Sequence, residues 1–165
     1  MKVCIRPLEE ADASTSVGWR NIPEIWAYTA SRPDHEITPE EELAWIRRVL
    51  ADPACRRFAI LADGRYVGNT YLTGIAGGEA EYHIFIGERD AWGKGIARQA
   101  TTQLLALAKS RLHLAHIHLS VHQANTGAVG LYRSIGFVPT RQAGADDFIT
   151  MTLDLNSFEE EKSHE

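Results

Sequence analysis

The stretch from Ala80 to Ala108 constrains the fold of this chain more than any other. It begins with an apolar, strand-like run, continues through Trp92-Gly93-Lys94-Gly95, and ends in an amphipathic segment without proline. A strand, a glycine-rich turn and a helix in this order make an anion site, because the N–H groups of the first helical turn lack acceptors within the helix. Gly93 and Gly95 let a ligand approach the backbone closely. The stretch therefore predicts a phosphate or pyrophosphate site.

The composition is that of an ordinary globular protein. The chain has 165 residues, 44% of them hydrophobic, and a net charge of −5. A nucleic-acid-binding surface would be basic, so no nucleic-acid partner is expected. No apolar run could span a bilayer or serve as a secretion signal, so we expect a cytoplasmic protein without a membrane partner. Cys4 and Cys55 lack metal or redox spacing and are expected to be reduced.

Hydrophobic periodicity and turn residues predict one mixed α/β (α+β) domain over residues 1–155 and a charged tail over 156–165. Strands are expected at Lys2–Arg6, Phe58–Ala62, Arg65–Thr73, Ala80–Gly87, His116–His122, Phe137–Thr140 and Phe148–Leu155. Helices are expected over Glu9–Val17, Gly95–Ala108 and Thr126–Ile135, and another from Pro39 through Leu50 that stops near Asp52-Pro53. Thr38 and Glu41 have the spacing of a capping box, and Asp63-Gly64 predicts a tight hairpin.

A second segment agrees with the phosphate site. Asn125–Phe137 reads NxxAxxLYxxxGF and follows a strand. Gly93-x-Gly95 alone is a weak signal, because Arg98 stands where a dinucleotide fingerprint would have its third glycine. Together, the strand–WGKGIA–helix unit and Asn125–Phe137 resemble motifs A and B of the GNAT superfamily of acyl-CoA-dependent N-acetyltransferases. The resemblance covers nearly the whole chain and includes the order of its elements.

The resemblance implies the GNAT fold, a central mixed and mostly antiparallel sheet of about seven strands flanked by about four helices. It also implies acetyl-CoA as acyl donor, with the pyrophosphate at the glycine-rich loop and pantetheine along the backbone of Ile84, Phe85 and Ile86. The residues expected to bind the cofactor are those three together with Trp92, Gly93, Lys94, Gly95, Ile96, Ala97, Arg98, Asn125, Ala128 and Leu131.

Tyr132 is the expected catalytic acid. Transfer of an acetyl group from a thioester to an amine expels a thiolate, and a phenol with an ordinary pKa near 10 can donate a proton to it. The family uses the tyrosine of this motif in that role, and Tyr132 matches it. The alternative is an aromatic residue that only packs.

The base that deprotonates the amine is less well defined. Glu81 and His83 share one face of their strand, and His118, Ser120 and His122 share one face of the next. Glu81 is the first choice by its place on the strand, although all of these side chains could instead be solvated or satisfied in the core. Four histidines lie near one another, His113, His116, His118 and His122, but no carboxylate or cysteine joins them at ligand spacing, so no metal is expected.

The acceptor is expected to be a small-molecule amine bound by the first helices. Trp19, Arg20, Asn21 and Trp26 resemble the corresponding segment of GNAT enzymes that acetylate nucleotide-linked amino sugars, since aromatic faces suit sugars and bases and arginine suits phosphate. Related branches acetylate ribosomal-protein N-termini or polyamines. A polyamine would need an acidic cleft, for which the candidates are Glu36, Glu40, Glu41 and Glu42. The two tryptophans could equally belong to the core.

Two other classes of function stay open at this stage. A GNAT-fold protein could bind acyl-CoA without turnover, although the presence of Tyr132 and Asn125 argues against it. A nucleotide-binding regulatory domain could use the same glycine-rich loop. A homodimer formed through an edge strand would fit the fold.

Overall fold

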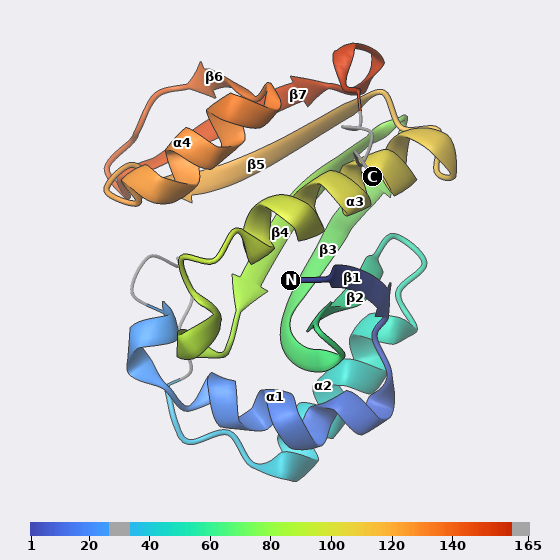
Figure 1. Cartoon of the computed structure of the whole chain (residues 1–165), viewed down its shortest axis with the longest axis vertical. Helices are drawn as coiled ribbons and strands as arrows, with labels where there is room; N and C mark the ends of the chain where they lie inside the picture. The colour runs from blue at the N-terminus through green and yellow to red at the C-terminus, as the bar shows by residue number, and fades with distance from the viewer. Residues whose placement is uncertain (27–33, 160–165) are drawn as a thin grey trace.

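The computed structural model describes residues 1–26 and 34–159 and contains one seven-stranded sheet with the strand order β1-β2-β3-β4-β5-β7-β6 (Figure 1). The strands are β1 (Val3–Pro7), β2 (Arg56–Ala62), β3 (Arg65–Ala76), β4 (Glu79–Ile86), β5 (His116–His122), β6 (Val138–Arg141) and β7 (Phe148–Asp154). The α-helices are α1 (Ala13–Arg20), α2 (Pro39–Leu50), α3 (Ile96–Ser110) and α4 (Thr126–Ile135), and the short 3₁₀ helices are η1 (Glu10–Asp12), η2 (Pro23–Trp26), η3 (Arg89–Ala91) and η4 (Leu155–Ser157). The predicted fold is confirmed.

All neighbouring strands are antiparallel except β4 and β5. These two are parallel and pair only from Glu79–His116 to Glu81–His118. Beyond that point β4 still pairs with β3 as far as Ile86, whereas β5 pairs with β7 as far as His122. The middle of the sheet therefore opens in a V between β4 and β5.

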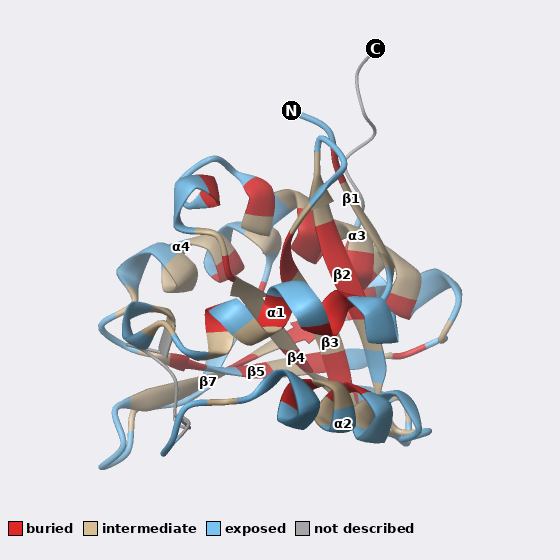
Figure 2. Ribbon diagram, turned by 90° about the horizontal axis from the view of Figure 1, so that it is seen from below, coloured by how far each residue is buried: buried red, intermediate tan, exposed pale blue. Residues whose placement is uncertain are grey.

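The helices cover both faces of the sheet. Ile60 packs in a cluster with Ile96 and Ala100 of α3, whereas its neighbour Ala59 packs with Ile46 of α2. Because side chains alternate along a strand, α3 and α2 lie on opposite faces. Figure 2 shows the buried residues gathered in the sheet and on the helix sides that face it. On β4, Ile84 packs in the cluster with α3 and Tyr82 packs on Tyr132 of α4, whereas Phe85 packs on Trp19 of α1, so its even- and odd-numbered residues face opposite sides of the sheet.

Local sequence signals explain most element ends. The capping box of Thr38 and Glu41 is present at the start of α2, where the Thr38 hydroxyl accepts from the Glu41 N–H at 3.2 Å. Gly95 precedes α3 in the left-handed conformation, with φ of 77°. None of the helices within the described ranges is long and apolar enough to cross a membrane.

The helix predicted over Glu9–Val17 is wrong in its bounds. The chain first forms η1 and then α1, which runs on to Arg20. The reason is the carboxylate of Asp12, which accepts from the backbone N–H of Glu9 at 2.8 Å and binds the guanidinium of Arg6 at 2.7 Å. These contacts stabilise a tight turn where the sequence pattern alone indicated a helix.

Candidate active site

The V between β4 and β5 is the centre of the candidate site. Ile84, Phe85 and Ile86 pair with β3 on one side and have no partner in β5 on the other. The carbonyl of Ile86 accepts a hydrogen bond from Nε1 of Trp92 at 3.0 Å. The strand edge that these three residues form has no partner strand on the side of β5 and is open to a ligand with amide groups, except at the Ile86 carbonyl that Trp92 already binds.

The glycine-rich loop leads from the end of β4 to the start of α3 (Figure 1). Gly93 and Gly95 have φ of 73° and 77°, and a Cβ placed on either would meet no atom within 4 Å. The space beside this backbone, together with the N–H groups of Ile96, Ala97 and Arg98 at the helix start, suits an anion. The loop has the geometry that the sequence predicted.

Two cations lie at this loop. Lys94 is exposed, and its ammonium makes no ion pair with any residue that the structure describes. Arg98 reaches across to α4, where it donates to the hydroxyl of Ser134 at 2.5 Å. Lys94 is therefore the cation available to a phosphate, whereas Arg98 connects α3 to α4.

A network that the sequence did not reveal anchors the loop. Arg65 at the start of β3 binds Glu88 at 3.1 Å and Asp90 at 3.0 Å, and Glu88 also accepts from Nε1 of Trp19 at 3.0 Å. No local sequence pattern could have predicted these contacts, because they join residues that are far apart along the chain. Arg65 and Asp90 are separated by 25 residues, and Trp19 and Glu88 by 69.

Tyr132 enters the site from α4. Its side chain is 7% exposed and packs edge-on against Tyr82 and Phe137, with ring centroids 6.2 and 5.6 Å away. Its hydroxyl has no hydrogen-bond partner among the described residues. Burial raises the pKa of Tyr132 to about 12, so the phenol is protonated at neutral pH. Glu81 is the last residue of β4 that pairs with β5, and Tyr82 follows it directly. Because Tyr132 packs on Tyr82, it lies near the vertex of the V.

The side chain of Asn125 caps the start of α4. Its side-chain oxygen accepts from the N–H of Ala128 at 3.3 Å. Ala128 and Leu131 are partly buried against the main core. The cap fixes the helix start and thereby the direction in which Tyr132 projects.

The opposite face of the vertex is polar. Glu81 lies 3.3 Å from Nε2 of His83 and 3.7 Å from Nε2 of His118, and Nε2 of His83 also lies 3.0 Å from the hydroxyl of Thr73. Burial, Arg57 and His118 together lower the pKa of His83, although Glu81 acts to raise it. The structure thus brings three of the candidate bases together. Ser120 is exposed farther along β5, and the ring of His122 lies against Phe148, with centroids 5.2 Å apart.

The residues predicted to bind the acceptor are engaged within the fold. Trp19 is 3% exposed and packs against Tyr66 and Phe85. Arg20 binds the buried carboxylate of Glu42 at 3.0 Å. Asn21 accepts from the N–H of Ile37 at 2.8 Å and donates to its carbonyl at 3.0 Å. The side chain of Trp26 lies outside the described residues.

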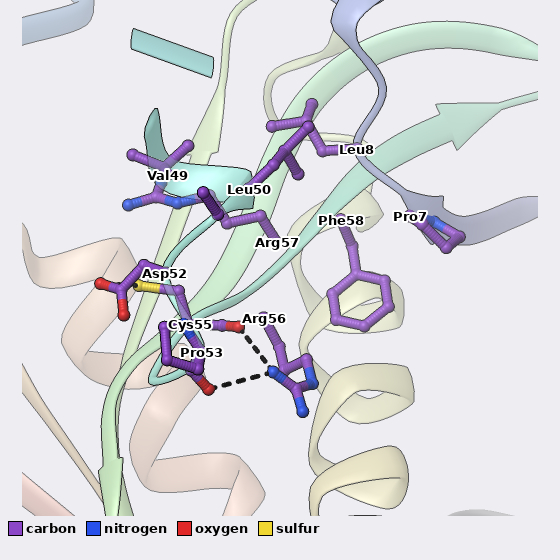
Figure 3. Close-up of a pocket in the computed structure, with 11 residues that line it drawn as sticks. Pro7, Leu8, Val49, Leu50, Asp52, Pro53, Cys55, Arg56, Arg57 and Phe58 are labelled. Atoms are coloured by element: carbon purple, nitrogen blue, oxygen red, sulfur yellow. Dashed lines mark hydrogen bonds between the residues drawn. The ribbon is translucent and has the colours of Figure 1, made fainter. Parts of the chain in front are cut away.

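Outside the V, two other kinds of ligand site come into question, a metal site and a pocket. Within residues 1–26 and 34–159 there is no group of three or more His, Cys, Asp or Glu side chains that could hold a metal ion. A pocket of about 300 Å³ lies between the end of β1, the end of α2 and the start of β2 (Figure 3). It contains none of the residues predicted for acetyl transfer, but it adjoins Arg57, whose charge acts on His83.

The split parallel strands, the glycine-rich loop before α3 and the buried tyrosine from α4 define the class of acyl-CoA-dependent N-acyltransferases. The family model described as the acetyltransferase (GNAT) domain matches residues 2–138, and the chain belongs to this family. The prediction of a GNAT N-acetyltransferase, whose family takes its acyl group from acetyl-CoA, is therefore confirmed.

Individual relatives are distant. The crystal structure of spermidine N-acetyltransferase from Vibrio cholerae in complex with CoA and spermine has a TM-score of 0.84 and 26% identity, covering 93% of this chain and 96% of that one. An N-acetyltransferase 9-like protein of Nematostella vectensis is 21% identical over 171 residues, 95% of this chain and 85% of its own length. An uncharacterised protein of Methanocaldococcus jannaschii is 23% identical over 151 residues, but the chain spans only 30% of that protein's length. Nothing among these relatives supports an amino-sugar acceptor.

Proposed function

We propose that this protein transfers the acetyl group of acetyl-CoA to a primary amine of a small polyamine by direct attack on the thioester. The observation that carries the proposal is the arrangement at the vertex of the V. Tyr132 lies on one face of β4, and Glu81, His83 and His118 lie on the other. An acid and a base on opposite faces suit a reaction in which the donor and the amine approach from opposite sides.

The residues of the loop and of β4 fit the cofactor. The N–H groups at the start of α3 would bind the pyrophosphate, with Lys94 as a neutralising cation, because Gly93 and Gly95 leave the space beside them open. The free edge of Ile84–Ile86 would pair with the amides of pantetheine, and one of its N–H groups would polarise the thioester carbonyl. Acetyl-CoA supplies the activated acetyl group.

In this scheme Tyr132 acts as the acid. The amine attacks the carbonyl carbon, the carbon–sulfur bond breaks, and the departing thiolate takes the proton of the Tyr132 hydroxyl. A hydroxyl without an internal partner is available for that transfer. Glu81 takes the proton that the amine loses, with His83 and His118 beside it.

Three observations favour a polyamine over a nucleotide-linked sugar. The similar structure from Vibrio cholerae is that of a spermidine N-acetyltransferase, matched over nearly its full length. Within this chain, Arg20, the side chain expected to bind a sugar nucleotide's phosphate, is paired with Glu42. Glu81 gives the vertex a carboxylate that attracts a cationic amine. Acetylation of ribosomal-protein N-termini has no comparable support.

The test is an assay of CoA-thiol release with acetyl-CoA and three groups of acceptors, namely spermidine and spermine, UDP- and TDP-amino sugars, and peptide N-termini. We expect turnover with the polyamines. Turnover with amino sugars alone would contradict the acceptor class, and none with any amine would favour a protein that binds acyl-CoA without catalysis.

The matched variant is Tyr132→Phe. It removes a hydroxyl without a partner, so the fold should keep its stability while turnover falls by about 10²–10⁴. Acetyl-CoA affinity, measured by thermal shift, should stay close to that of the parent protein. Equal turnover in both proteins would remove Tyr132 from the acid role.

A further inference from the structure

A continuous stack of cations and aromatic rings runs from α1 to the vertex of the V. The guanidinium of Arg20 lies 4.0 Å from the ring centroid of Trp45, and that of Arg57 lies 4.9 Å from the same ring. Arg57 also lies 4.0 Å from the ring of Tyr71, which in turn stacks on His83 with centroids 4.7 Å apart and planes 10° from parallel. The stack ends at the candidate base, Glu81.

Arg57 is an unusual member of this stack. Its guanidinium contacts the thiol of Cys55 and its charge acts on Asp52, but its Nε atom is buried without a hydrogen-bond partner among the described residues. A buried donor without an acceptor lowers stability, and an apolar side chain could fill the gap between the two rings without that penalty. Packing between the two rings therefore does not by itself explain why this position has a cationic side chain.

The strand registers place Arg57 directly in line with the site. Arg57 on β2 is opposite Tyr71 on β3, and Tyr71 is opposite His83 on β4. The other groups that face His83 are Thr73 on β3, its strand neighbour Glu81, and His118 on β5. Among the residues that the structure describes, Arg57 is the permanent cation and Glu81 the carboxylate whose charges act on His83.

We propose that Arg57 is a positioning residue for acetyl transfer, which through Tyr71 holds the imidazole of His83 beside Glu81 and so keeps Glu81 available to the incoming amine. The inference rests on the proposed function, in which Glu81 must be free to take the proton of the amine. A protonated His83 at 3.3 Å would pair with Glu81 and compete with the incoming ammonium group.

The electrostatics of His83 agree with this role. Burial lowers the pKa of His83 first, Arg57 and His118 lower it further, and Glu81 opposes them. Without the charge of Arg57, the attraction of Glu81 would be less opposed, so the pKa of His83 would rise and His83 would take up a proton at higher pH. The expected signature is therefore an acid limb of the pH–rate profile that moves upward when the charge is removed.

The experiment compares Arg57→Met with Arg57→Lys, which keeps the charge. In each protein, kcat/KM for spermidine is measured against pH, and the imidazole of His83 is titrated by NMR. Arg57→Met should raise both the acid limb and the titration midpoint of His83 by about 0.5–1 pH unit, whereas Arg57→Lys should leave the midpoint near that of the parent protein. The KM for acetyl-CoA should change little in either variant.

A profile and a His83 titration in Arg57→Met that coincide with those of the parent protein would overturn the inference, even if stability falls. If Arg57→Met does not fold, Arg57→Gln gives the same comparison with a polar, uncharged side chain of similar length. The NMR titration needs no substrate, so it tests the stack even if the protein proves inactive toward every amine. Failure of the proposed function and failure of this inference are thereby distinguishable.

Discussion

Gly87 is the position where one added methyl group should disturb both the core and the cofactor loop. It follows β4 directly and lies against the indole of Trp19. A Cβ at Gly87 would stand 2.0 Å from Cδ2 and 2.3 Å from Cγ of Trp19. Trp19 has little freedom to move, because it is 3% exposed, packs against Tyr66 and donates to Glu88. Gly87→Ala therefore forces the indole or the end of β4 to shift.

The size of the effect follows from these contacts. Overpacking in a core costs about 1–3 kcal/mol, and loss of the Trp19–Glu88 hydrogen bond would add about 1 kcal/mol. For a chain of this size each kcal/mol lowers Tm by about 2–4 °C, so we expect a decrease of roughly 4–16 °C. Because Glu88 and Asp90 both bind Arg65, the shift should also reach the glycine-rich loop and weaken acetyl-CoA binding.

Thermal and urea unfolding measure the first effect, and the thermal shift produced by acetyl-CoA measures the second. Gly18→Ala in α1 is the matched control, since a Cβ there meets no atom within 4 Å and alanine is the better helix former. In a double-mutant cycle with Trp19→Leu, whose smaller side chain can move aside, Gly87→Ala should cost less than in the parent protein. A fully stable Gly87→Ala variant, or strict additivity with Trp19→Leu, would refute the clash.

Two further predictions concern pH. Burial acts to raise the pKa of Asp12, but hydrogen bonds from Arg6 and from the N–H of Glu9 outweigh it and lower the pKa. The stabilisation is therefore present above the unfolded value near 4 and is lost as pH falls through the lowered folded value, so the free energy of unfolding of Asp12→Asn should depend less on pH in acid than that of the parent protein. Hydrogen bonds that the ring N–H groups of His35 donate to the carboxylates of Glu41 and Asp34 raise the pKa of His35 to about 9, so its stabilisation is complete below 6.5 and is lost as pH rises toward 9. Glu41→Gln should lower the midpoint of His35 in an NMR titration, and an unchanged midpoint would contradict the pairing.

Features of the fold that depend on a few adjacent residues were predictable from the sequence. The capping box of Thr38 and Glu41 is present as predicted, and the predicted glycine-rich turn before α3 places Gly95 in the left-handed conformation. Asp63 and Gly64 have φ of 49° and 83°, which is the conformation that their sequence favours in a two-residue hairpin. Each of these depends on backbone preferences and contacts within one turn, so a single stretch of sequence contains the information.

The acceptor side could not be derived in this way. Trp19 and Arg20 are aromatic and cationic, as a sugar-nucleotide site requires, but the fold directs them to Glu88 and Glu42, which are 69 and 22 residues away in sequence. Arg57 and Arg65 gave no signal for the same reason, since their significance comes from partners on other strands. Residue type shows what a side chain can bind, whereas its partner depends on which strand lies beside it.

Strand register therefore determines the chemistry of this site. Along β4, Tyr82 turns toward α4 and packs on Tyr132, whereas Glu81 and His83 turn toward the opposite face of the sheet. If β4 slipped by one residue against β3, its two sets of side chains would exchange faces. The phenol of Tyr82 would then lie on the face where the carboxylate of Glu81 now lies. The pairing of Tyr71 with His83 fixes that register, and the end of β4–β5 pairing at Glu81 fixes where the strands part. The proposed acid, the proposed base and the open strand edge thus lie close together because β4 contributes residues to both faces of the sheet.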